Sequence, residues 1–123
     1  MGDFSDLIVY KKAFALAMDI FRITYNFPKD EMYGLTSQIR RSSRSVCANL
    51  SEGYRKRQYQ PHFLSKLSDS DMENTETQVW LSFALSCGYI SPEIKQGLEE
   101  QTKEIGKLFS YMMRNPEKFG SKP

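Results

Sequence analysis

Residues Gln38–Arg57 read QIRRSSRSVCANLSEGYRKR, and this stretch decides how the chain is expected to fold. Together with Leu35 just before it, the stretch carries apolar and small residues at helical spacing, which predicts one buried helix face. That row consists of Leu35, Ile39, Ser42, Val46 and Leu50. At about 100° per residue, Arg40, Arg41 and Arg44 lie more than about 100° from the centre of the row. These arginines are therefore expected to point away from the core face of their own helix.

Helical spacing continues along the rest of the chain, whereas sustained alternation of the kind that marks a half-buried strand is absent. Short connections between successive helices favour antiparallel neighbours. We therefore predict an all-α fold, an up-down-up-down antiparallel four-helix bundle that forms a single domain over 1–123. The helices are expected at about residues 6–27, 32–53, 61–87 and 92–114, followed by a mobile tail, 115–123.

Proline, glycine and serine residues indicate where these helices start and stop. Pro28 is expected to end the first helix, because the residue before a proline is pushed out of the α region. Gly53 is expected to cap the end of the second helix in the left-handed conformation. Pro61 and Pro92 suit first turns, and Ser91 suits the N-cap position before the fourth helix.

The first helix carries two apolar rows, although a bundle helix needs only one. One row is Val9, Ala13, Leu16, Ile20 and Ile23, and the other is Tyr10, Phe14, Ala17 and Phe21. The second row is a hint of self-association. The third helix has a row that is polar in its middle, at Ser70, Asn74 and Thr77. Buried polar groups need hydrogen-bond partners, and Asn49 is a plausible partner for them.

The composition is ordinary for a globular protein, at 40% hydrophobic and 26% charged residues with a net charge of +2. The N-terminus lacks the pattern of a secretory signal, and no segment approaches a membrane span, so a cytoplasmic location is expected. Cys47 and Cys87 are expected to be free thiols. With one histidine and no glycine-rich phosphate loop, we predict no metal site, no cofactor and no catalytic residues, hence no enzyme.

Several segments occur in an order that resembles a known family. They are FPKDEMYGL at 27–35, QIRRSSRSVCANLSEG at 38–53, Phe63-Leu64, Glu76 and CGYIS at 87–91. The chain resembles the four-helix-bundle proteins encoded within intervening sequences of bacterial 23S rRNA genes. The most specific part of the resemblance comprises Gln38, Arg41, Ser45, Asn49, Glu52 and Gly53.

This resemblance implies a homo-oligomer, a ring-like pentamer, with a nucleic-acid role. A related accessory protein of diversity-generating retroelements shares the architecture, which implies that a reverse transcriptase-like partner is also conceivable. Two departures from the family pattern are Ser51, where alanine is usual, and Met72-Glu73, which replaces a Gly-Ser step.

The basic residues of the second helix and the loop after it are candidates for binding RNA or DNA. Guanidinium groups match phosphate geometry, and tyrosine rings can stack on unpaired bases. The candidate nucleic-acid-binding residues are Arg40, Arg44, Tyr54, Arg55, Lys56, Arg57 and Tyr59.

A structural role is the alternative for part of this charge. Asp69, Glu73 and Glu76 form an acidic strip on the third helix, and Arg41 or Arg44 could pair with it within one subunit or across an interface. We assign Arg41, Asn49, Glu52 and Glu76 to structural polar contacts. The sequence thus predicts a non-enzymatic homo-oligomeric module that binds nucleic acid, RNA above DNA, with a protein-binding oligomeric scaffold as the alternative.

Overall fold

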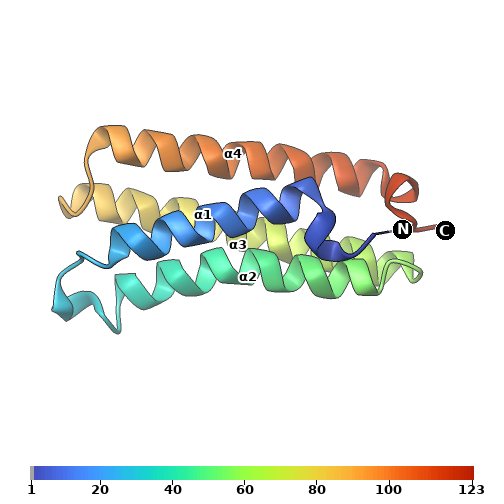
Figure 1. The fold of residues 1–123 in the computed structure, drawn as a ribbon, viewed down its shortest axis with the longest axis horizontal. Helices are drawn as coiled ribbons and strands as arrows, with labels where there is room; N and C mark the ends of the chain where they lie inside the picture. Colours follow the sequence, from blue (N-terminus) through green and yellow to red (C-terminus); the bar gives the residue numbers. More distant parts are fainter. Residues whose placement is uncertain (1) are drawn as a thin grey trace.

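The structure, a computed structural model that describes residues 2–123, confirms the all-α bundle. Successive helices run up and down, and both termini lie at the same end as the connection between the second and third helices (Figure 1). The α-helices within residues 2–123 are α1 (Ile8–Thr24), α2 (Leu35–Arg55), α3 (Gln60–Ser86) and α4 (Pro92–Arg114). Short 3-10 helices are η1 (Phe4–Asp6), η2 (Lys29–Glu31) and η3 (Pro116–Phe119).

Side-chain caps explain where α2 and α4 begin. Ser91 Oγ accepts a hydrogen bond from the backbone N–H of Ile94 at 3.1 Å, as expected of the N-cap of α4. The start of α2 is capped by a carboxylate from outside the helix: Glu31 Oε1 accepts from the Leu35 N–H at 3.0 Å. Glu31 also accepts from the Tyr89 hydroxyl at 2.9 Å, so this cap ties the α1–α2 and α3–α4 connections together.

The prediction that Gly53 caps α2 is wrong. The helix continues to Arg55, and Gly53 lies inside it, buried against α3. A Cβ atom on Gly53 would come within 2.7 Å of Lys66 Cβ. The glycine is required because α2 and α3 approach closely at this point.

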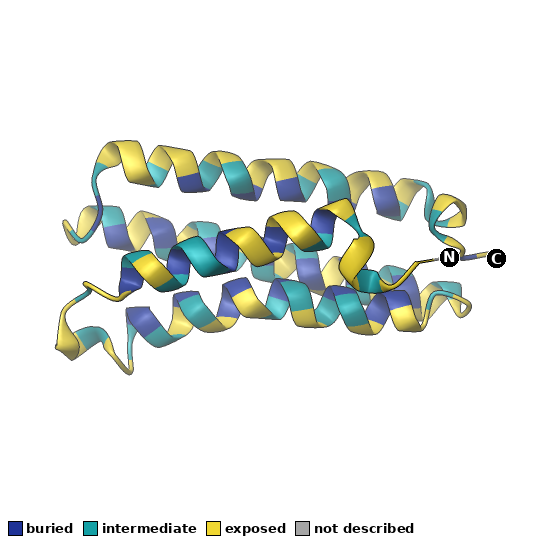
Figure 2. Ribbon diagram, in the orientation of Figure 1, coloured by how far each residue is buried: buried dark blue, intermediate teal, exposed yellow. Residues whose placement is uncertain are grey.

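The core is continuous from one end of the bundle to the other, and buried positions line the inner side of every helix (Figure 2). The predicted row of α2 lies in it, as do Val9, Ala13, Leu16 and Ile20 of α1. The largest side chains that are fully buried are Phe63, Phe109, Ile20, Ile39, Leu50, Leu67, Leu81 and Ile105.

The second apolar row of α1 is only partly covered within the chain. Ala17 is buried, Tyr10 and Phe21 are half-buried, and the Phe14 side chain is 52% exposed. The row therefore leaves aromatic surface uncovered on the outside of α1.

The polar middle of the α3 row is buried and bonded to neighbouring helices. Ser70 Oγ donates to the Val46 carbonyl at 2.6 Å, and the hydroxyls of Thr77 and Ser42 are 2.8 Å apart. Asn74 Nδ2 donates to the Thr102 carbonyl of α4 at 2.8 Å. Asn49 is not the partner, because the backbone carbonyls of Val46 and Thr102 and the hydroxyl of Ser42 fill that role.

Asp71 of α3 is half-buried against α4, beside Gly106. Burial raises the pKa of its carboxyl group above the ordinary value. A raised pKa means that the folded state favours the protonated acid, so stability is lost as the pH rises through that pKa. Asp71→Asn is therefore expected to melt at a higher temperature than the unmodified protein at pH 7 and at no higher temperature at about pH 3, below the ordinary pKa of aspartate.

Thermal melts of Asp71→Asn and of Asp69→Asn, an exposed aspartate on the same helix, test this expectation at both pH values. Asp69→Asn controls for the general effect of removing one negative charge. An equal gain from both variants at pH 7 would show that burial of Asp71 is not the cause.

The segment after α4 is ordered, contrary to the expected mobile tail. Residues Pro116–Phe119 form η3, Phe119 packs against the core and Ser121 is buried. Apolar burial of Phe119 holds the tail on the bundle end. Among the helices of residues 2–123, none is both long and apolar enough to cross a bilayer.

Candidate nucleic-acid interface

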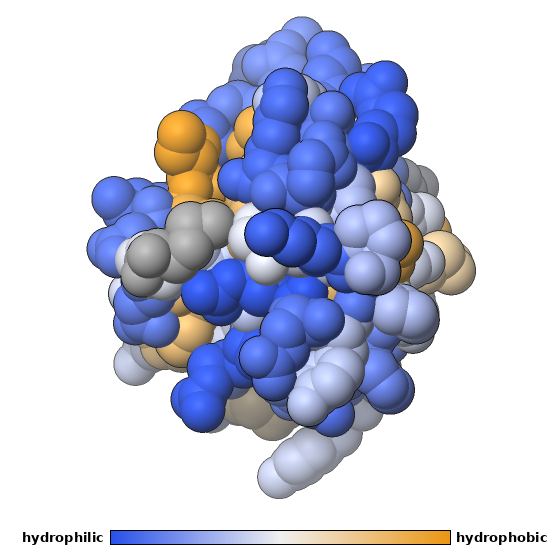
Figure 3. Space-filling model, turned by 90° about the vertical axis from the view of Figure 1, so that its right-hand side faces the viewer, coloured by the Kyte–Doolittle hydropathy of each residue, from blue (hydrophilic) through white to orange (hydrophobic). Residues whose placement is uncertain are grey.

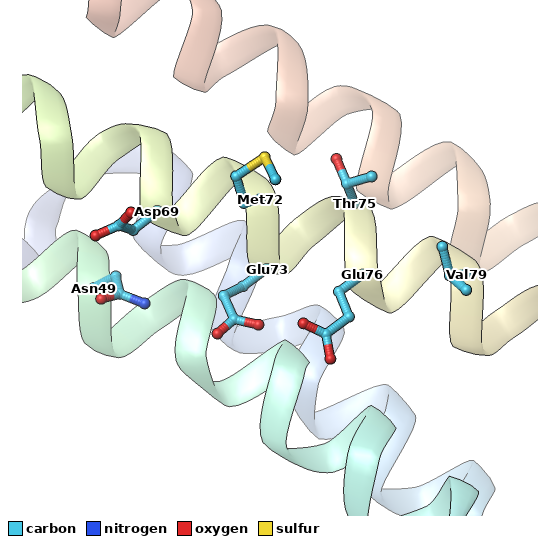
Figure 4. Close-up of a pocket in the computed structure, with 7 residues that line it drawn as sticks. All are labelled: Asn49, Asp69, Met72, Glu73, Thr75, Glu76 and Val79. Carbon is cyan, nitrogen blue, oxygen red and sulfur yellow. The ribbon is translucent and has the colours of Figure 1, made fainter.

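Arg41 ties α2 to α3. Its Nη1 contacts Glu73 Oε2 at 3.1 Å, and its Nη2 contacts Glu73 Oε1 at 3.3 Å and Glu76 Oε1 at 2.6 Å. Figure 4 shows both carboxylates turned toward α2, while Met72 and Thr75 point to the other side. Hydrogen bonds to Glu73 and Glu76 raise the pKa of Arg41. Arg41 thus pairs with the acidic strip inside one chain. One of its two partners, Glu73, belongs to the Met72-Glu73 step that departs from the family pattern.

Lys66 makes a second, separate tie between α2 and α3. Its ammonium group donates to Asn49 Oδ1 at 3.2 Å and pairs with Glu52 Oε2 at 2.7 Å. The hydrogen bond from Lys66 lowers the pKa of Glu52. The four residues assigned to structural contacts therefore divide between two clusters, Arg41 with Glu76 and Asn49 with Glu52, and Lys66 completes the second.

Tyr54 and Arg57 hold the end of α2, and Tyr54 is not a stacking surface for bases. The Tyr54 side chain is 4% exposed. The Arg57 guanidinium lies 4.0 Å from the centre of the Tyr54 ring, and its Nη1 donates to the Tyr54 carbonyl at 2.7 Å. The Tyr54 carbonyl in the last turn thus accepts from the Arg57 side chain as well as from the Arg57 backbone N–H at 3.3 Å, so both side chains are used by the fold.

Arg40 is half-buried in the seam between α1 and α2. Its Nε donates to Thr24 Oγ1 at 2.8 Å, and its guanidinium lies 4.8 Å from the centre of the Phe21 ring. Arg44, one turn further, lies 5.8 Å from the same ring centre. A cation over an aromatic face is attracted by the ring quadrupole, so Phe21 positions both guanidinium groups.

Arg44, Arg55 and Lys56 form the unneutralised part of this surface. All three are exposed, and none has a carboxylate within salt-bridge distance in the part of the chain that the structure describes. Arg44 and Arg55 are eleven residues apart, which places them about 16 Å apart and within about 20° on the same side of α2. Together with Arg40 and Tyr59 we call these residues the basic strip.

Tyr59 supplies an aromatic side chain at the end of the basic strip. It is 57% exposed, and its ring makes an edge contact with His62, at 6.2 Å between centres. Viewed from this end of the bundle, the surface is mainly hydrophilic, with only small apolar areas (Figure 3). Exposed cations with an exposed ring suit an anionic polymer better than a small substrate.

Two open depressions of opposite charge flank the Arg41 tie. One, of about 470 Å³, lies on α2 and is lined by Met32, Thr36, Ser37, Arg40, Arg41, Arg44, Ser45 and Ala48. The other, of about 600 Å³, is lined by Asn49, Asp69, Met72, Glu73, Thr75, Glu76 and Val79 (Figure 4). Over residues 2–123, no group of three or more His, Cys, Asp or Glu residues is placed to hold a metal ion.

Two features of this surface escaped the sequence analysis. Lys66 is a single lysine with no local pattern that pairs it with Asn49 and Glu52. The contact of Phe21 with Arg40 and Arg44 was not predicted because these residues lie on different helices. The spacing of Phe14, Phe21 and Tyr25, at i, i+7 and i+11, was the available signal, since these positions share one side of a helix.

The fold and its surface define an antiparallel four-helix bundle with a basic outer strip on α2. The chain belongs to the family of 23S rRNA-intervening sequence proteins, whose sequence profile matches residues 5–111. This confirms the resemblance that the motifs indicated.

A solved structure agrees with the family assignment. It is a protein of unknown function from the S23 ribosomal protein family of Bacteroides thetaiotaomicron VPI-5482, with a TM-score of 0.76 and 27% identity. The alignment covers 86% of this chain and 98% of that chain. No curated protein matches the chain.

Proposed function

We propose that this protein is a non-enzymatic, homo-oligomeric module that binds nucleic acid, RNA in preference to DNA, through the basic strip of α2. The observation that carries the proposal is the exposed, unpaired charge of Arg44 and Arg55 on one side of α2 and of Lys56 directly after its end. Exposed cations held on a rigid helix can replace the counterions of a phosphate backbone. Contacts to phosphates hold a nucleic acid in place without reading its sequence.

The contacts within the fold reduce the number of candidate residues for this role. Arg41, Tyr54 and Arg57 are used by the fold, which leaves Arg40, Arg44, Arg55, Lys56 and Tyr59. Few contacts per chain suffice if several subunits bind one molecule, because linked sites multiply affinity through effective concentration. The pentamer that the family resemblance implies, and the cytoplasmic location expected from the sequence, belong to this proposal.

Binding of the purified protein to single-stranded RNA, duplex RNA and DNA across a salt series tests the proposal. The double charge reversal Arg55→Glu with Lys56→Glu is expected to weaken binding of single-stranded RNA at least about tenfold at low salt. It should also reduce the slope of log affinity against log salt by about 1.4, since each lost phosphate contact on a single strand contributes about 0.7.

The matched control is Lys103→Glu with Lys107→Glu, which makes the same change in net charge on the exposed side of α4. This control is expected to leave the slope unchanged. Equal losses from both double variants would indicate a nonspecific effect of net charge. An unmodified protein that binds no nucleic acid at low salt would overturn the proposal.

A protein-binding scaffold is the second candidate, and the acidic depression on α3 favours it. The exposed residues Met72, Val79 and Phe83 lie at i, i+7 and i+11 on one side of that helix. Exposed apolar side chains grouped in this way are typical of protein interfaces. Under this alternative the charges serve contacts to other subunits or to a reverse transcriptase-like partner, and light scattering should show that the Arg55 and Lys56 reversals dissociate the oligomer.

A further inference from the structure

The outer side of α1 carries a row of aromatic rings directly beside the basic strip. Tyr25, the residue that follows α1, is 75% exposed, and Phe14 is 52% exposed. The Tyr25 ring packs by its edge against Phe21, with 6.1 Å between ring centres. Phe21 thus supports an open tyrosine face on one side and the guanidinium groups of Arg40 and Arg44 on the other.

We infer that this seam between α1 and α2 is a stacking site for single-stranded nucleic acid, in which an unpaired base lies on Tyr25 and its phosphate contacts Arg40 and Arg44. The inference rests on the proposed function and narrows its ligand class from nucleic acid in general to single strands. The proposed binding surface then includes the outer side of α1 and Tyr25 as well as the basic strip.

The two guanidinium groups are held in place but retain free donors. Arg40 uses its Nε on Thr24 Oγ1, at 2.8 Å, and its terminal nitrogens have no acceptor among residues 2–123. The Arg44 side chain makes no hydrogen bond with any described residue. Both arginines also line the basic depression of about 470 Å³. A guanidinium group presents several donors in a fixed plane, which suits a phosphate oxygen pair.

The combination of flat rings and unpaired cations favours a nucleic acid over an apolar protein partner. Single strands expose base faces that stack on aromatic rings, while their phosphates require neighbouring positive charge. A duplex keeps its bases stacked on one another and offers none of these faces. The site therefore predicts that single strands bind more tightly than duplexes of equal length.

Tyr25→Ala tests the inference with a labelled single-stranded RNA of mixed sequence and with the duplex formed from it. The variant is expected to weaken single-strand binding about tenfold, the order of effect that removal of a stacking ring produces. Duplex binding should change less than twofold. The salt slope should stay unchanged because no charge is removed, and Tyr25→Phe should bind like the unmodified protein because it keeps the ring.

Two further variants complete the experiment. Tyr111→Ala removes another exposed aromatic ring, 40% exposed and on α4, and is expected to leave binding of both RNAs unchanged. Arg44→Gln should weaken binding of both RNAs and reduce the single-strand salt slope by about 0.7. Circular dichroism and light scattering on each variant establish that fold and oligomer are retained.

Three results for Tyr25→Ala, and two for the unmodified protein, would overturn the inference. Tyr25→Ala could leave single-strand binding unchanged, could weaken both RNAs equally, or could change the mass of the oligomer, which would make Tyr25 a protein contact. If the unmodified protein binds both RNAs equally and the Arg55 and Lys56 reversals abolish this binding, the stacking site is wrong and the proposed function stands. If the unmodified protein binds no RNA, both are wrong.

Discussion

Phe63→Ala is expected to lower the free energy of unfolding by about 3 to 5 kcal/mol, the usual cost of truncating a buried phenylalanine. Phe63 lies in the first turns of α3 and is fully buried in the core. Its removal leaves a cavity where α3 packs on the C-terminal part of α2, near Gly53. The rigid seam between these helices limits how far the surroundings can collapse, which places the loss in this range.

Phe83→Ala is the matched control, because it deletes the same side chain from the same helix at a position that is 54% exposed. Its expected loss is below about 1 kcal/mol, since most of the ring already contacts solvent and little transfer energy is lost. Urea unfolding followed by circular dichroism measures both variants. Similar losses would show that Phe63 is not the core residue that the structure indicates, or that Phe83 is buried in an oligomer, and repeating the titration at several protein concentrations separates these cases.

The fold was largely predictable from the sequence because a single physical pattern determines it. Apolar and small residues at helical spacing in Gln38–Arg57 predicted the buried face of α2, and the same spacing predicted the core row of α1. Ser91 and Pro92 placed the start of α4 correctly, because N-capping depends on residues close together in the chain. Local chemistry and periodicity were sufficient to predict the helix faces and helix starts that depend on residues close together in the chain.

Long-range contacts explain where the prediction failed. The expected mobile tail is ordered because Phe119 reaches the core, and no local pattern near the chain end reports that contact. Tyr54 was expected to present an exposed ring, yet its position one helical turn after Leu50 places it in the buried row. The basic residues that follow Tyr54 indicated an exposed loop, although helical spacing continued through Tyr54.

The candidate site was predictable as a set of charges but not as a geometry. The sequence identified every arginine of α2, and it left open whether Arg41 or Arg44 pairs with the acidic strip. Only the packing of α3 on α2 shows that Arg41 takes Glu73 and Glu76, whereas Arg44 stays unpaired in the described chain. Which cation is free depends on helix rotation and register, and these are properties of the assembled bundle.

Gly53→Ala is expected to destabilise the protein by about 1 to 3 kcal/mol, the cost of overpacking a tight interface. A Cβ at this position would stand 2.7 Å from Lys66 Cβ, an atom close to the backbone of α3 that cannot swing aside. The two helices would have to separate at this point. Separation would also stretch the Lys66 contacts to Asn49 and Glu52, which are 3.2 and 2.7 Å long.

Gly97→Ala provides the control with the opposite sign. Gly97 lies inside α4, is exposed, and a Cβ there would meet no atom within 4 Å. Alanine should therefore stabilise the protein by about 0.5 to 1 kcal/mol, because glycine loses more backbone freedom when a helix forms. Urea unfolding of both variants should thus give changes of opposite sign. If Gly53→Ala stabilised the protein as much as Gly97→Ala, helix propensity alone would govern both sites and close packing at Gly53 would be wrong.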